Sequence, residues 1–179
     1  GGATCPITPG GAKGYPQTLE LDVINHGPVP LPGDKAPLSK NQPINGPDVF
    51  SLDEICSAQP HDDMHAMTIA DAVESGKPTV ILFAAPGFCP SFTCGPDMEL
   101  MQKLEAKDRD KANFVHIESP NSLQDHTHTG PFDAAHQQRQ GHQGTYKPQV
   151  QTAKEWGLTT EPWLFFVDKS GTVVDRFEG

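Results

Sequence analysis

Two cysteines, Cys89 and Cys94, stand where thiols are well placed for redox chemistry. They follow the apolar run at residues 79–85, which predicts a buried strand, and they precede a segment at 96–107 whose apolar spacing predicts a helix. Thiols in such a strand-to-helix turn lie near the free N–H groups and the positive dipole end of the helix, which favour the thiolate form. A dithiol in that position can exchange disulfides with other thiols.

The two other cysteines, Cys5 and Cys56, complete an even set of four. In an exported protein, four cysteines allow two disulfides in three pairings. If Cys89 pairs locally with Cys94, the remaining bridge is Cys5–Cys56. In the chain-entropy account, closing that long loop stabilises the fold by roughly 4 kcal/mol, and closing the short loop by only about 2 kcal/mol. We therefore predict a structural disulfide between Cys5 and Cys56 and assign the chemistry to the local pair.

The composition narrows the class of protein. Glycine (17) and proline (18) together supply 35 of the 179 residues, well above the usual share of about 12%, so much of the chain is expected to be loop. A net charge of −10 argues against nucleic acids and anionic membrane surfaces as partners.

No stretch approaches the ~20 apolar residues of a membrane span. The first residues lack the basic and apolar regions of a signal peptide, and we expect a trimmed or truncated chain.

The chain divides near residue 50. Residues 1–50 read as a Pro/Gly-rich extension, or the remnant of a preceding β domain, with one predicted strand at 18–23. Residues 51–179 form the compact domain, in which Thr68 is the expected N-cap of the first helix. Its predicted elements are helices at 69–75, 96–107 and 150–156 and strands at 79–85, 113–118, 163–167 and 172–177. Their order indicates an α/β domain with a mixed sheet.

Three features in register resemble the thioredoxin-like superfamily, and most closely the exported thiol–disulfide oxidoreductases of the TlpA/ResA type. The sequence Cys94-Gly95-Pro96 after a strand is similar to the Cys-Gly-Pro of that family. Glu161-Pro162 precedes the strand at 163–167, where the family holds a cis-proline that faces the dithiol. The aspartate–glycine turn at 168–171 is similar to the closing hairpin of the family. The resemblance covers roughly residues 66–179.

The resemblance implies a thioredoxin-like mixed sheet flanked by helices and disulfide exchange on protein clients outside the cytoplasm, without an organic cofactor. By the order of the family's cysteines, Cys89 attacks the client and Cys94 resolves the mixed disulfide. Pro162 completes the catalytic site, and Glu161 and Pro162 offer their backbone to an extended client segment.

The sequence departs from the family pattern in three ways. Four residues separate Cys89 from Cys94, whereas the family has two. Residues 79–88 contain no Asp or Glu, although many members bury a carboxylate beneath the dithiol. The chain stops at Gly179, without the family's final helix, so we expect a truncated chain, or a sheet face that the N-terminal extension or a partner covers.

These departures leave alternatives open. The cysteine pair is also compatible with a purely structural disulfide, with a thioredoxin-fold copper chaperone that uses two cysteines and a distant histidine, and with a non-catalytic subunit of a larger assembly. Histidine spacing matches no known ligand set, so we predict no metal site. His61 and His65 are expected on one helix face, and His116 as a hydrogen-bonded core residue. The remaining histidines are His26, His126, His128, His136 and His142.

Overall fold

The computed structural model describes residues 27–46, 52, 55–60, 62–87, 92–118 and 151–179. The strand predicted at 18–23 lies outside these residues, as do Cys5 and Cys89.

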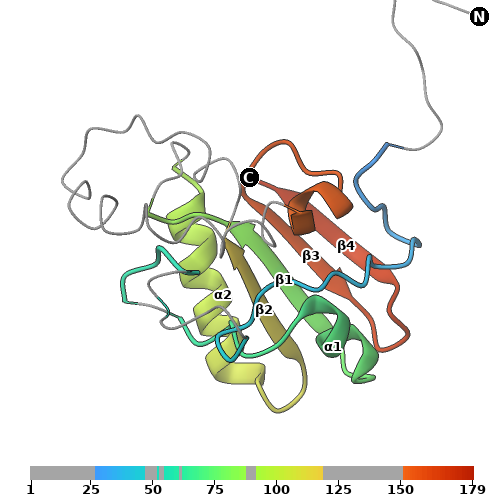
Figure 1. Cartoon of the computed structure of the whole chain (residues 1–179), viewed down its shortest axis with the longest axis horizontal. Helices are drawn as coiled ribbons and strands as arrows, with labels where there is room; N and C mark the ends of the chain where they lie inside the picture. Colours follow the sequence, from blue (N-terminus) through green and yellow to red (C-terminus); the bar gives the residue numbers. More distant parts are fainter. Residues whose placement is uncertain (1–26, 47–51, 53–54, 61, 88–91, 119–150) are drawn as a thin grey trace, which may run out of the picture.

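A mixed four-stranded sheet forms the centre of the domain (Figure 1). Its strands are ordered β2-β1-β3-β4; β1 is parallel to β2, and β3 and β4 run antiparallel to their neighbours. The elements are α1 (Ile69–Glu74), β1 (Thr79–Ala84), α2 (Cys94–Asp108), β2 (Asn113–Glu118), β3 (Trp163–Val167) and β4 (Val173–Glu178). The predicted fold class is confirmed: the mixed sheet with flanking helices is consistent with a thioredoxin-like α/β fold.

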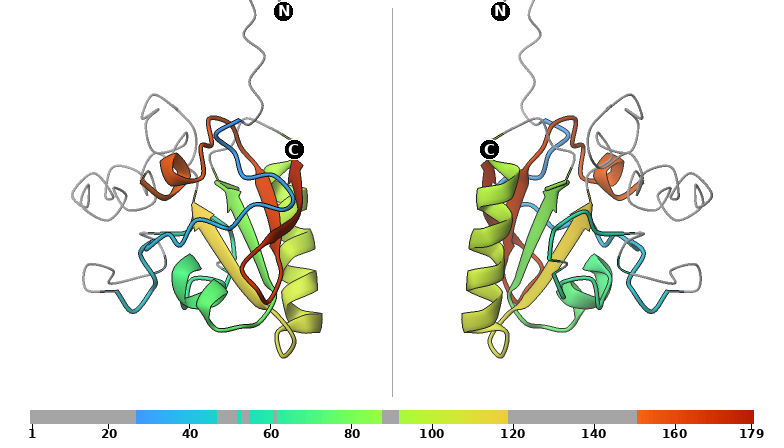
Figure 2. Two further views of the ribbon diagram at one scale, coloured as in Figure 1. Left: turned by 90° about the vertical axis from the view of Figure 1, so that its right-hand side faces the viewer. Right: turned by 90° about the vertical axis from the view of Figure 1, so that its left-hand side faces the viewer.

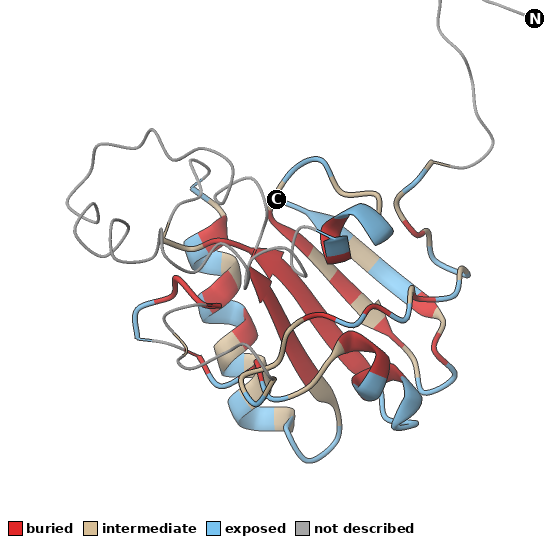
Figure 3. Cartoon of the chain, viewed as in Figure 1, coloured by how far each residue is buried: buried red, intermediate tan, exposed pale blue. Residues whose placement is uncertain are grey.

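Helices α1 and α2 cover opposite faces of the sheet, as Figure 2 shows. All six residues of β1 are buried, because this central strand has neighbours on both sides and a helix over each face (Figure 3). Ile81 and Phe83 belong to the apolar cluster that includes α1. Leu82 packs on the other face with Met98 and Met101 of α2. Alternate residues of β1 therefore supply two separate cores.

The ends of the helices follow local sequence signals. Thr68 and Asp71 form the expected capping box of α1, in which the Thr68 hydroxyl accepts the Asp71 N–H at 3.0 Å. α2 begins at Cys94, two residues earlier than predicted, with Pro96 inside its first turn. The thiol of Cys94 thus belongs to the helix and not to the preceding turn.

Aromatic side chains fill the core on the α1 face. The ring centroid of Trp156 lies 4.6 Å from that of Phe165 and 5.4 Å from that of Phe83. Trp163 stacks on Phe165 with a centroid distance of 5.7 Å. Both tryptophans therefore belong to the core, and Trp163 directly follows Pro162.

The described N-terminal segment runs beside β4 as far as residue 36 (Figure 1). The N–H of Gly33 donates to the carbonyl of Val173 at 2.8 Å, and the N–H of Val173 donates to the carbonyl of Asp34 at 2.9 Å. The Arg176 guanidinium donates to the carbonyls of Val29 and Pro30, each at 3.2 Å. These contacts attach the segment to the edge strand of the sheet. The domain boundary near residue 50 stays a prediction.

The contact between the N-terminal segment and the domain can be tested at Gly157. This residue has φ +66°, and a Cβ built on it would lie 2.5 Å from the carbonyl oxygen of Pro28. Gly76 has φ +76° with nothing within 4 Å, so it is a matched control. We predict that Gly76→Ala lowers the free energy of unfolding by about 1 kcal/mol, from backbone strain alone. Gly157→Ala should cost about 2–4 kcal/mol, because overpacking adds to the strain. Equal losses in urea denaturation would contradict the packing of Pro28 on the domain.

Candidate functional site

Cys94 occupies the first position of α2 and is only 1% exposed. It packs in the apolar cluster between α2 and the sheet, with Leu82, Ala84 and Met98. Its sulfur is in a disulfide. Because Cys56 is a free cysteine, the partner of Cys94 lies outside the described residues. The pairing with Cys89 therefore stays a prediction.

The predicted Cys5–Cys56 disulfide is wrong, because Cys56 carries a free thiol. The thiol is buried, and its Sγ donates a hydrogen bond to Oδ2 of Asp62 at 3.2 Å. Burial raises the pKa of this thiol, although His116 opposes the shift. Cys5 and Cys56 were paired because they remained once Cys89 was assigned to Cys94, whereas Asp62 is the polar partner of the Cys56 sulfur inside the domain.

The start of β3 meets the first turn of α2 around Gly179. The Glu161–Pro162 peptide bond is cis, as the resemblance implied. A Cβ built on Gly179 would lie 2.8 Å from Cγ of Pro162, 3.0 Å from Oγ1 of Thr93 and 3.0 Å from Oδ2 of Asp97. The Gly179 N–H also donates to the Pro162 carbonyl at 3.1 Å. Pro162 and the residue preceding Cys94 therefore border one small space.

The surface beside Cys94 combines an exposed ring and a partly buried carboxyl group. Phe92, two residues before Cys94, is 97% exposed. Partial burial raises the pKa of Asp97 in the first turn of α2. An aromatic side chain so exposed next to a buried sulfur offers apolar contact area to a protein partner.

A buried carboxyl group does lie at this end of the sheet, but it comes from a neighbouring strand. Glu118 ends β2 and is in register with Ala84, the last residue of β1. Its Oε2 accepts the N–H of Ser57 at 2.9 Å, and Oε1 has no hydrogen-bond partner among the described residues. Burial raises the pKa of Glu118 to about 7, and the charge of Glu161 adds to the rise, while His116 and Ser57 oppose it.

Sequence reasoning missed Glu118 because it searched only residues 79–88 for such a group. The alternation of residues 113–118 carried the signal, since it places Glu118 on the same face as Phe114 and His116. Two hydrogen bonds through Ser57 join this carboxyl group to Gly87, in the segment that follows β1 and leads toward the cysteines. The Ser57 N–H donates to Glu118, and the Gly87 N–H donates to Oγ of Ser57 at 2.9 Å.

A second polar cluster lies on the same face of the sheet. It unites Cys56, Asp62, His65 and His116, all buried, with one ligating atom of each residue within 4.8 Å of the others. His116 is hydrogen-bonded inside the core, as predicted, but His65 lies in a turn before α1 and not on a helix. His61 lies outside the described residues.

Charges within this cluster stabilise one another. Burial alone would lower the pKa of His116, but the neighbouring Asp62 carboxylate raises it well above its usual value. Burial alone would raise the pKa of Asp62, and His116 and His65 together hold it below its usual value. Sequence reasoning missed this cluster because Cys56 and His116 are 60 positions apart and no ligand motif joins them.

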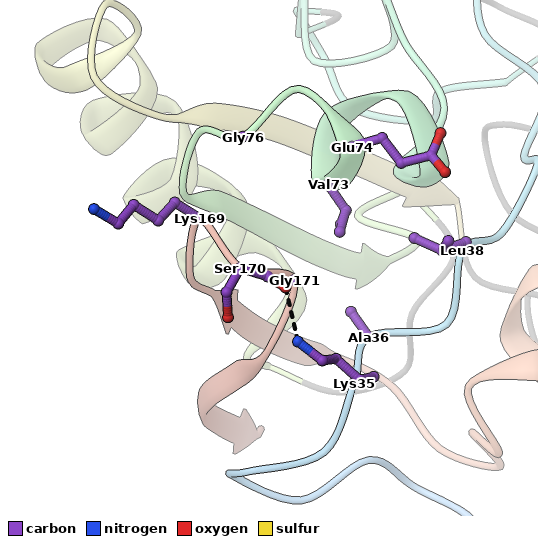
Figure 4. A pocket seen from close by; sticks show the side chains of 9 residues that line it. All are labelled: Lys35, Ala36, Leu38, Val73, Glu74, Gly76, Lys169, Ser170 and Gly171. Atoms are coloured by element: carbon purple, nitrogen blue, oxygen red, sulfur yellow. Dashed lines mark hydrogen bonds between the residues drawn. The ribbon is translucent and has the colours of Figure 1, made fainter.

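A pocket of about 310 Å³ lies at the other end of β1, away from the cysteine turn (Figure 4). It is bounded by the end of α1, by residues 35–38 and by the turn at 169–171, and Nζ of Lys35 donates to the Ser170 carbonyl at 2.8 Å. This pocket is separate from both polar sites.

Comparisons with known proteins give limited results. No protein-family model matches the chain, and no curated protein matches it. Among solved structures, the chain is similar to the pneumococcal exposed lipoprotein thioredoxin from Streptococcus pneumoniae, with 18% identity and a TM-score of 0.39. The likeness covers 59% of this chain and 77% of that one. The function proposed below therefore rests on this chain's own residues.

Within the described residues, no helix is both long and apolar enough to cross a bilayer.

The burial of Glu118 predicts a pH-dependent stability. Its pKa is about 7 in the folded protein and is expected near the ordinary 4.5 in the unfolded chain, so the folded state holds the proton more tightly. This contribution to stability is complete below pH 4.5 and is lost as the pH rises through 7. Between pH 4.5 and pH 8, the wild type should lose about 3 kcal/mol of unfolding free energy through this group. Glu118→Gln has no carboxyl group to titrate there, so it should not show this loss.

Urea denaturation at both pH values, with a chelator present, measures this difference. Glu74→Gln is the control, because Glu74 is an exposed carboxylate on α1. A Glu118→Gln effect of the same size at both pH values would refute the prediction.

Proposed function

We propose that this protein exchanges disulfides with protein clients through Cys89 and Cys94. One observation carries the proposal: the first residue of α2, Cys94, is held in a disulfide at the carboxyl end of β1. A helix N-terminus stabilises the thiolate that must form whenever this disulfide opens. Pro162 lies beside the same helix turn, as the Gly179 contacts indicate.

The exchange proceeds in two balanced steps. The Cys89 thiolate attacks one sulfur of a client disulfide, so a mixed disulfide forms and the other client sulfur leaves as a thiolate. The Cys94 thiolate then attacks the sulfur of Cys89, which releases the second client thiolate and forms the Cys89–Cys94 disulfide. Two electrons pass to the client, and the leaving thiolates take up two protons. The reverse sequence oxidises a client, and an external dithiol restores the reduced protein in the forward direction.

Three features of the surrounding structure support this chemistry. Glu118 places a buried carboxyl group at the same end of the sheet, joined to the cysteine turn through Ser57 and Gly87. Exposed Phe92 offers an apolar contact to an unfolded or extended client. We assign the backbone of Glu161 and Pro162 to pairing with that client segment.

The proposal includes a location outside the cytoplasm. Disulfides persist in oxidising compartments, whereas cytosolic reductants keep most thiols reduced. Cys94 is held in a disulfide, and Cys56, which carries a free thiol, is buried.

Cysteine variants test the proposal with a disulfide-bonded protein such as insulin as client and dithiothreitol as the reductant. Wild type should accelerate reduction of the client. Cys89→Ser should lower the rate to that of the reductant alone, since the attacking sulfur is lost. Cys94→Ser, reduced and then freed of dithiothreitol before it meets the client, should accumulate a mixed disulfide between Cys89 and the client, because no second thiol resolves it. Non-reducing electrophoresis and mass spectrometry identify that adduct.

Cys5→Ser is the control and should keep the wild-type rate. Wild-type activity in Cys89→Ser would show that the pair is only a structural bridge. Loss of activity in Cys5→Ser would show that Cys94 works with a different partner, and the proposed pair would be wrong.

A further inference from the structure

We propose that Cys56, Asp62, His65 and His116 form a closed binding site for one divalent cation of the zinc class. Each of these side chains offers a metal-ligating atom, and none of the four residues is more than 4% exposed. The site uses neither sulfur of the proposed dithiol, so it is independent of disulfide exchange.

Several distances among the ligating groups are close to those of tetrahedral coordination. Zn–N and Zn–O bonds of about 2.0–2.1 Å place two ligands of a tetrahedron roughly 3.3 Å apart, and a sulfur ligand lies slightly further away. Nδ1 of His116 lies 3.1 Å from Nε2 of His65 and 2.9 Å from Oδ2 of Asp62. Nε2 of His65 lies 3.3 Å from Oδ1 of Asp62. Sγ of Cys56 lies 3.2 Å from Oδ2 of Asp62. The four ligating atoms all lie within 4.8 Å of one another, so a cation would draw the widest pair together by up to about 1.5 Å.

The charge and chemistry of the donor set favour zinc. One thiolate, one carboxylate and two neutral imidazoles carry a charge of −2, which a divalent cation neutralises inside the protein. Thiolate, imidazole and carboxylate are all accepted ligands of Zn²⁺. Cu⁺ favours soft sulfur ligands and Mg²⁺ favours oxygen, so neither matches a set with one sulfur, two nitrogens and one oxygen.

His116 is oriented in the manner of a metal ligand. Its Nε2 lies 3.1 Å from the carbonyl oxygen of Ala84, which can only accept, so Nε2 carries a proton. In the neutral ring, Nδ1 then presents its lone pair to the cluster. A backbone carbonyl that fixes the tautomer of a ligating histidine is a common second partner at metal sites.

The backbone holds the other ligands in place before any cation binds. The N–H of His116 donates to the Met64 carbonyl at 2.9 Å, which attaches the turn containing Asp62 and His65 to the outer edge of β2. The Ile44 N–H donates to the His65 carbonyl at 2.8 Å, and the Met64 N–H donates to Oδ1 of Asp62 at 3.0 Å. Ligands fixed in this way bind a cation with little loss of conformational entropy.

Four buried protein ligands leave no position for a substrate, which is the arrangement of structural rather than catalytic zinc. The cation would join three segments that are distant in the sequence: Cys56, the turn at 62–65 and strand β2. Without a cation, a protonated His116 forms an ion pair with Asp62 in the same place. The experiment must therefore separate a metal site from a proton-held network.

Cobalt and zinc titrations of the full chain make that separation. The chain is treated with a chelator, dialysed and kept oxidised, so that the disulfide sulfur of Cys94 is not a ligand. Co²⁺ should bind with a stoichiometry of one and give the thiolate-to-cobalt charge-transfer band and intense visible bands of tetrahedral cobalt. Zn²⁺ should abolish both. Free Zn²⁺ at about 100 times its dissociation constant should raise Tm by roughly 5–10 °C.

Variants assign the ligands. Cys56→Ser should remove the charge-transfer band, and His65→Gln should weaken binding more than about 100-fold, since loss of a ligand exceeds the usual effect of a second partner. His128→Gln is the histidine control and should bind as wild type does. The proposal is overturned if wild type binds no stoichiometric metal and shows no shift in Tm. It is also overturned if binding survives Cys56→Ser combined with His65→Gln, or depends on His128.

Discussion

Complete burial of β1 is the constraint on which the rest of the structure depends. A strand with a neighbour on each side and a helix over each face has a defined register, because a one-residue slip would exchange its two apolar faces. This register brings the carboxyl end of β1 between the end of β2 and the start of β3. The start of α2, Glu118 and Pro162 therefore lie at one end of the sheet, although they are distant in the sequence.

The α2 face of the sheet carries sulfur in two different states. Cys94 is in a disulfide and Cys56 is a free thiol, yet both belong to the same apolar cluster. Burial of polar groups is costly unless they have partners. Cys56 has that partner in Asp62, which is in turn balanced by two histidines. The polar cluster thus explains how a thiol persists near a disulfide, and a bound cation would fix it there.

The sequence predicted well whatever depends on local pattern. The alternation at 113–118, the capping box of Thr68 and Asp71, and the apolar run of β1 each act over a few residues, and the structure contains all three. Features that depend on tertiary contact were missed. Cys56 was assigned to a disulfide because it remained with Cys5 after the local pair, and no sequence pattern pointed to its buried partner Asp62. To predict the cluster around His116, one must know which turn packs on β2, and the spacing of residues in the sequence does not give that information.

The measurement that tests the central claim most directly is the reduction potential of the disulfide that holds Cys94. The protein is equilibrated in thiol–disulfide buffers of graded potential, alkylated, and digested, and mass spectrometry identifies the partner cysteine and the reduced fraction. Disulfide exchange predicts Cys89 as the partner and a potential of roughly −270 to −120 mV, the range of known exchange proteins. A potential below about −300 mV, or a bond from Cys94 to Cys5, would identify a structural bridge and contradict the account.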